Sequence, residues 1–115
     1  MEKICLVKDG EKKFLDVERV GAFGKIRGLM FRRREDAPTL LFDFEKPVAM
    51  PIHSFFCPVF LAVWLDGGNN VVEKKVVTPW KLRVLPDKKF CKLIEIPLNN
   101  KYSEIIRFLD GNKKI

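Results

Sequence analysis

His53 is the one histidine of this 115-residue chain, and Cys57 follows it four residues later. An imidazole beside a thiolate is the pair that nucleophilic cysteine enzymes use. Both residues lie in the nearly unbroken apolar run 50–66, however, and such a run predicts strands buried on both faces. Four residues of extended strand span roughly 13 Å, which is too far for a thiolate–imidazole pair. We therefore expect His53 to be a packed or rim residue, with the lining of a ligand site as the alternative.

A dense group of cations could bind phosphate or carboxylate groups, because arginine forks match both anions. The chain carries 22 Lys and Arg against 15 Asp and Glu, a net charge of +7, but most of this charge is scattered. A solvated face is the simpler interpretation, since Glu35 and Asp36 follow directly and Phe31 is the sole aromatic residue within the group. The alternative is a polyanion-binding patch made of Lys25, Arg27, Arg32, Arg33 and Arg34.

Trp80 follows Thr78 and Pro79, a sequence typical of a loop. An exposed indole there could stack on a sugar or a peptide, whereas the alternative is a lid over one end of the fold. We take four residues as the candidate patch for a small ligand or protein partner near one end of the fold: Arg27, Arg32, His53 and Trp80. A hydrolase would instead need paired carboxylates, for which the candidates are Asp43, Glu45 and Asp66.

The composition predicts one folded domain over residues 1–115, because a chain of this length can bury a core without cross-links. The three cysteines, Cys5, Cys57 and Cys91, show no CxxC spacing, so we expect free thiols, no metal and no cofactor. No stretch resembles a secretory signal or a clean membrane span, which favours a cytoplasmic protein that does not bind membranes. Lys and Glu are abundant and glutamine is absent, a bias that suggests a thermophilic source.

The elements that would position these residues are short strands separated by Gly, Pro, Asn and Asp turns. Asp9-Gly10 predicts a hairpin, and 66–70 (DGGNN) a loop that tolerates positive φ. Short helices are predicted near 20–30 and 100–110, the second from apolar residues at i, i+3, i+4 and i+7. The predicted strands are 3–8, 14–20, 39–44, 49–57, 60–65, 71–78, 82–85 and 90–96. Together they predict a mainly β fold, an antiparallel sandwich or barrel.

Five ordered blocks resemble one known family, the domain-of-unknown-function 192 proteins, also called uncharacterised protein family 0127. These blocks are GLMFR at 28–32, LLFDF at 40–44, IHSFFCPVFLAVWLD at 52–66, TPW at 78–80 and LIEIP at 93–97. The resemblance covers about residues 17–98 and implies a jelly-roll β-sandwich with minor helices. It implies no catalytic residues, because no activity is settled for the family. Two departures stand out: Ala62 replaces a common acidic residue, and the usual glycine is missing at Leu98-Asn99.

The favoured hypothesis is a non-enzymatic module that binds a small ligand or a protein partner. A basic module that binds nucleic acid weakly is the alternative, and a hydrolase is the second alternative. Nothing in the sequence requires a dimer.

Overall fold

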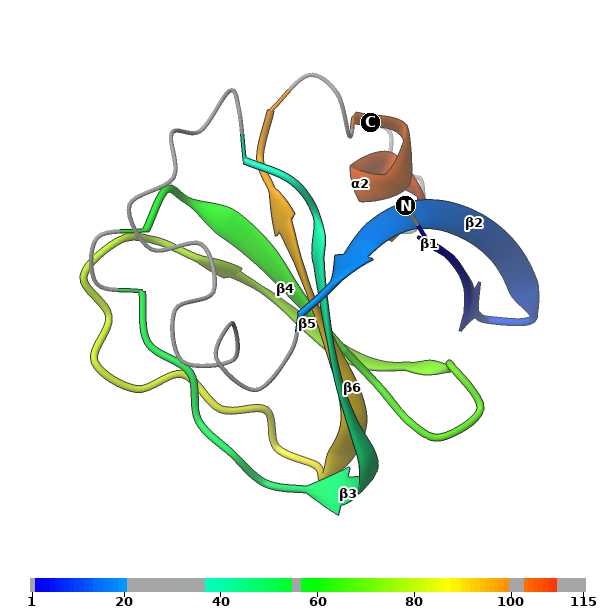
Figure 1. The fold of residues 1–115 in the computed structure, drawn as a ribbon, viewed down its shortest axis with the longest axis horizontal. Coiled ribbons are helices and arrows are strands. Elements are labelled where there is room, and N and C mark those ends of the chain that lie inside the picture. The colour runs from blue at the N-terminus through cyan, green and yellow to red at the C-terminus, as the bar shows by residue number, and fades with distance from the viewer. Residues whose placement is uncertain (1, 21–36, 55–56, 100–102, 110–115) are drawn as a thin grey trace.

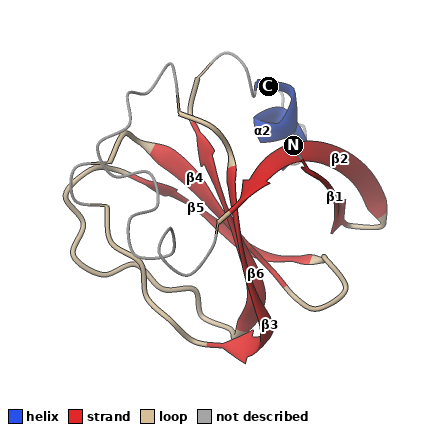
Figure 2. Ribbon diagram, in the orientation of Figure 1, coloured by secondary structure: helices blue, strands red, loops and turns tan. Residues whose placement is uncertain are grey.

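The computed structural model describes residues 2–20, 37–54, 57–99 and 103–109, and its sheet is ordered β1-β2-β3-β6-β4-β5. Figures 1 and 2 show a curled sheet that forms a half-barrel, with a short helix at the top of the view. The protein is therefore mainly β, as predicted. The described elements are β1 (Glu2–Lys8), β2 (Glu11–Arg19), β3 (Leu40–Val48), β4 (Phe60–Leu65), β5 (Val71–Val77), β6 (Phe90–Pro97) and α2 (Ser103–Leu109).

Both predicted turns join antiparallel strands. Asp9 and Gly10 have φ values of 52° and 83°, the pair of positive values that a two-residue hairpin between β1 and β2 requires. Between β4 and β5, Asp66 accepts hydrogen bonds on Oδ1 from the backbone N–H groups of Gly68 and Asn70, each at 2.9 Å. Asn69 has a φ of 66°, so this loop uses the positive φ that its composition predicted.

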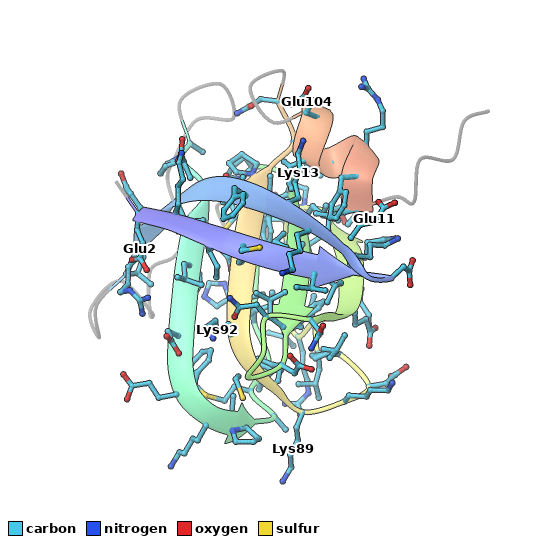
Figure 3. The ribbon with its side chains drawn as sticks, turned by 90° about the vertical axis from the view of Figure 1, so that its right-hand side faces the viewer. Glu2, Glu11, Lys13, Lys89, Lys92 and Glu104 are labelled. Atoms are coloured by element: carbon cyan, nitrogen blue, oxygen red, sulfur yellow. The ribbon has the colours of Figure 1, made fainter. Side chains whose placement is uncertain are left out.

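The sheet is mixed rather than purely antiparallel, because β2 and β3 run parallel where Glu18 pairs with Leu40. A parallel pair needs a long connection, and residues 20–39 supply one. The other strand pairs are antiparallel. The N–H of Val7 donates to the carbonyl of Asn69 at 2.9 Å, which ties the end of β1 to the start of β5 and curls the sheet. Figure 3 shows β1 crossing in front of β3, β6 and β4.

Each face of the central strands is covered by a different part of the chain. The hairpin and α2 cover one face, to the right in Figure 1, and the loops that join β3 to β4 and β5 to β6 lie to the left. β4 is therefore buried on both faces, as its continuous apolar sequence predicted. Trp64 packs edge-on against Phe90 on the loop-covered face, with ring centroids 6.3 Å apart.

Two predicted strands are wrong. Within 49–57, where residues 55 and 56 lie outside the described part, and within 82–85, the structure has one isolated bridge, Ile52 to Val84. Pro51 and Pro58 lack the N–H that a ladder needs, which explains the interruption. The helix predicted near 20–30 falls almost wholly on residues outside the described ranges. The helix predicted near 100–110 is confirmed by α2, and among the described residues no helix is long and apolar enough to cross a membrane.

Candidate functional site

A pair of adjacent loop segments brings two of the predicted site residues into the same region. Ile52 and Val84 exchange backbone hydrogen bonds of 2.9 and 2.8 Å, and the N–H of Ser54 donates to the carbonyl of Lys81 at 3.0 Å. Segments 52–54 and 81–84 therefore run side by side on the loop-covered side of the sheet. His53 lies on the first segment and is half-buried, while Trp80 directly precedes the second.

Ser54 fixes the geometry of this loop pair, although it is a small polar residue in a mainly apolar run. Its buried hydroxyl donates to the carbonyl of Thr78 at 2.6 Å and accepts from the N–H of Lys81 at 2.7 Å. Its carbonyl accepts from the N–H groups of Trp80 at 3.1 Å and Cys57 at 3.2 Å. Sequence reasoning missed this role. The available signal was a hydroxyl within a buried stretch, which must find hydrogen-bond partners.

Trp80 has a left-handed backbone with a φ of 69°. Pro79 precedes it, as in turns that place proline first and a positive-φ residue second, where glycine is the usual choice. A bulky residue there carries strain of about 1–3 kcal/mol, and the hydrogen bonds to Ser54 hold it in place. The side chain is 61% exposed, more than a lid over the core would leave.

The exposed segment around this residue is continuous. All six residues from 78 to 83 are exposed, and Leu82 is the most exposed large apolar side chain of this segment at 76%. Lys81 and Arg83 alternate with Trp80 and Leu82 along the chain. We call residues 78–83 the Trp80 surface. It offers apolar contact and positive charge together on a backbone that Ser54 holds in place.

Glu95 is a buried acidic residue at the centre of the loop-covered face. Its position on β6 pairs with Leu40 on β3 and Ala62 on β4, and Ala62 in turn pairs with Lys75 on β5. The residue is 5% exposed, and burial raises the pKa of its carboxyl from 4.5 to about 8. Sequence reasoning missed it, although the acid stands within the apolar block LIEIP.

Cys57 lies near this carboxyl. Burial, followed by the charge of Glu95, raises the pKa of the thiol to about 12, so the reactive thiolate is scarce at neutral pH. The extended spacing assumed between His53 and Cys57 is wrong, because the N–H of Cys57 donates to the carbonyl of Ser54 at 3.2 Å. The chemistry of the thiol nevertheless argues against a cysteine nucleophile at this position.

Two of the three carboxylates considered for hydrolysis, Asp43 and Asp66, accept structural hydrogen bonds. Burial raises the pKa of Asp43, but hydrogen bonds from Arg19 and from the N–H of Glu45 outweigh it, and the net pKa is lowered. The backbone hydrogen bond from Asn70 is the largest cause that lowers the pKa of Asp66. The carboxylates of Asp43 and Asp66 are therefore held as anions by the donors around them, whereas a catalytic dyad needs one carboxyl kept protonated. Glu45 is exposed.

Arg19 is the centre of the ion-pair network on the opposite side of the sheet. Its guanidinium donates to both oxygens of Glu2, at 2.9 and 2.7 Å, and to Asp43 at 3.0 Å. The hydrogen bonds to Glu2 and then to Asp43 raise its pKa. The Nζ of Lys13 on β2 lies 3.8 Å from a carboxylate oxygen of Glu104 on α2, and both residues are labelled in Figure 3. These pairs join strands and helix, which is a structural role.

The remaining predicted site residues lie outside the described ranges. Arg27 and Arg32 of the candidate ligand patch are among them. So are all five residues of the candidate polyanion patch, Lys25, Arg27, Arg32, Arg33 and Arg34. Among the described residues, no group of three or more His, Cys, Asp or Glu side chains is placed to hold a metal ion.

Two solved structures resemble the fold. One is a protein of Sinorhizobium meliloti 1021 described as a candidate transcription regulator, with a TM-score of 0.70 and 18% identity over 90% of this chain and 84% of that one. The other is a protein of unknown function from Novosphingobium aromaticivorans DSM 12444, with a TM-score of 0.69 and 13% identity over 90% of this chain and 76% of that one. At these identities the likeness shows a shared fold alone. No protein-family model matches the chain, and no curated protein matches its sequence.

Proposed function

We propose that this protein is a non-enzymatic binding module whose Trp80 surface contacts a protein partner. The observation that carries the proposal is Trp80 itself, an exposed indole on a left-handed backbone that a buried serine holds in place. Strained backbone of this kind persists where the surroundings over-determine it, and it is concentrated at functional sites. Tryptophan is also the residue most enriched among the energetic centres of protein interfaces.

Two properties of the loop pair support binding rather than catalysis. Its hydrogen bonds hold the exposed side chains in one arrangement before a partner arrives, so that less ordering entropy opposes binding. The buried thiol and the anionic carboxylates described above lack the activation that nucleophilic or acid–base chemistry requires. A small ligand that stacks on Trp80, with His53 on the adjacent segment, is the other form of this proposal.

The test is to pan a random peptide library against the immobilised protein. The counter-target is the double variant Trp80→Ala, Leu82→Ala, and the matched control is Phe14→Ala, which removes a 66% exposed aromatic side chain from β2. The proposal expects enriched peptides that lose binding to the double variant and keep it on the control. Peptides that bind all three proteins equally, or no enrichment over a blank surface, would remove the proposal.

Nucleic acid is the second candidate ligand. Cations alternate with Trp80, the basic group 25–34 adds five more, and one solved structure of the same fold is described as a candidate transcription regulator. Binding of this kind weakens steeply as salt is raised, because neutralised phosphates release counterions. Filter binding of single- and double-stranded DNA and RNA at two salt concentrations tests it. Absent or salt-insensitive binding would exclude it.

We also propose membership of the domain-of-unknown-function 192 family, on the strength of the five ordered sequence blocks. From the sequence we further propose that the fold is a jelly-roll sandwich, that the protein is cytoplasmic and that its source is thermophilic. The position of the family's common acidic residue, Ala62 here, pairs directly with the buried Glu95.

A further inference from the structure

Exposed cations gather in the part of the chain that follows Trp80, with few acidic residues among them. On the hairpin, Lys3 lies 2.7 Å from Asp16, and Arg19 lies 2.7 Å from Glu2. In residues 78–89 the one acid is Asp87, and among the described residues no salt bridge involves any of four exposed cations: Lys81, Arg83, Lys88 and Lys89. Figure 3 shows Lys89 projecting from the lower end of the molecule. This segment of the chain therefore carries a net positive charge.

The same segment exposes apolar surface between its charges. Trp80 and Leu82 are 61% and 76% exposed, and Lys81 separates them in the sequence. A partner that neutralises the cations without covering these two side chains would leave the main apolar area in water. Complementarity therefore calls for a partner that carries carboxylates and an apolar side chain close together.

We infer that the Trp80 surface binds an acidic segment of a protein that carries an aromatic or aliphatic anchor residue. This inference rests on the proposed function and names the partner class for the same surface. A protein segment suits the surface better than a nucleic acid does, because single-stranded nucleic acids bind by stacking successive bases on aromatic rings. The segment has one aromatic ring, and the more exposed apolar residue, Leu82, has no ring on which a base could stack.

The experiment uses the full chain and defined probes. The first probe is a labelled peptide of about twelve residues with six Asp or Glu, one Phe and one Leu in a Gly-Ser background. In a second peptide the acids become Asn or Gln, in a third the Phe and Leu become Ala, and an oligo-dT of equal length is the fourth probe. Fluorescence anisotropy is measured with the parent, Trp80→Ala, and the charge-reversal variant Lys81→Glu, Arg83→Glu. The matched charge control is Lys12→Glu, Lys46→Glu, two exposed cations on β2 and β3.

We expect the acidic apolar peptide to bind best. Charge reversal at 81 and 83 should weaken it roughly tenfold or more, and the charge control should not. Removal of the indole should weaken it roughly thirtyfold, the size of effect typical of an interface centre. Raised salt should weaken binding.

The failures of the two proposals are distinguishable. If the neutral peptide binds as tightly as the acidic one, but Trp80→Ala still weakens both, the acidic partner is excluded and the binding surface stands. If Trp80→Ala leaves peptide binding unchanged, both proposals fail. Tighter binding of oligo-dT than of the acidic peptide would overturn the inference in favour of nucleic acid. Absence of binding by any probe at millimolar concentration would also overturn it, and library panning would then decide the proposed function independently.

Discussion

Replacing Glu95 with glutamine should remove a large part of the pH dependence of folding stability. The carboxyl is 5% exposed on the central strand β6, and burial raises its pKa to about 8. In the unfolded chain the same group titrates near its ordinary value of 4.5. The folded protein therefore keeps a proton that the unfolded chain releases as the pH rises.

The sign and size follow from linkage. Where the folded state binds more protons than the unfolded state, stability falls as pH rises. The contribution of Glu95 is thus fully present below pH 4.5 and is lost as the pH rises towards 8, the interval between the two pKa values. At about 1.4 kcal/mol per pKa unit, the loss between pH 4 and pH 7 is on the order of 3 kcal/mol. Glutamine has nearly the same shape and does not titrate.

Urea unfolding of the parent and Glu95→Gln, measured at intervals from pH 4 to pH 9, tests this directly. The difference in free energy of unfolding between the variant and the parent should grow by that amount as the pH rises to 7. Glu18→Gln, an exposed carboxyl on β2, is the matched control, and its curve should run parallel to that of the parent. If the stability of Glu95→Gln also runs parallel to that of the parent across this pH range, the argument that burial raises the pKa of Glu95 is refuted.

Three further substitutions test other parts of the structure. Trp80→Gly should be more stable than Trp80→Ala by about 1 kcal/mol in urea unfolding, because only glycine takes the left-handed backbone without strain; equal stability would contradict that backbone. Ser54→Ala should lower the free energy of unfolding by about 2 kcal/mol, because it removes two hydrogen bonds made by a buried hydroxyl. A loss within experimental error would show that the hydroxyl does not hold the loop pair. Ala62→Asp places a carboxyl opposite Glu95 on the neighbouring strand. At pH 8 its free energy of unfolding should be lower than that of Ala62→Asn by at least about 2 kcal/mol. Equal stability of the two variants would mean that positions 62 and 95 do not interact.

The regular elements were predictable because local chemistry specifies them. Asp9-Gly10 fits few conformations other than a tight hairpin turn, and the continuous apolar run 60–65 is the strand buried on both faces. Ile105 and Leu109, four residues apart, bury one face of α2 as the helical period predicted. In each case neighbouring residues carry the whole signal.

The connections between elements were not predictable in the same way. The parallel pairing of β2 with β3 depends on where a connection of about twenty residues returns the chain, which no local pattern records. Segment 49–54 is apolar like a strand, yet Pro51 interrupts it, and its backbone bonds mainly to the 81–84 segment. An apolar loop that covers a sheet face and a buried strand of the sheet have similar compositions, so composition alone does not distinguish them.

The candidate site combines residues that the sequence pointed to and residues that it did not. Trp80 was identified from its loop setting, and the structure shows it exposed beside the segment that carries His53. Ser54 and Glu95 were missed because their importance depends on burial, which brings distant partners to the first and removes solvent from the second. Both stand out in the sequence only as polar residues within apolar runs.

The most direct test of the binding surface is an amide and indole NMR titration of ¹⁵N-labelled protein with the acidic apolar peptide and with any peptide obtained by panning. The chain has two indole N–H signals, one from exposed Trp80 and one from fully buried Trp64. The account predicts that the Trp80 indole and the amides of Lys81 and Leu82 shift on binding while the Trp64 indole does not. Shifts centred on the β1–β2 hairpin, with the Trp80 signal unmoved, would contradict it.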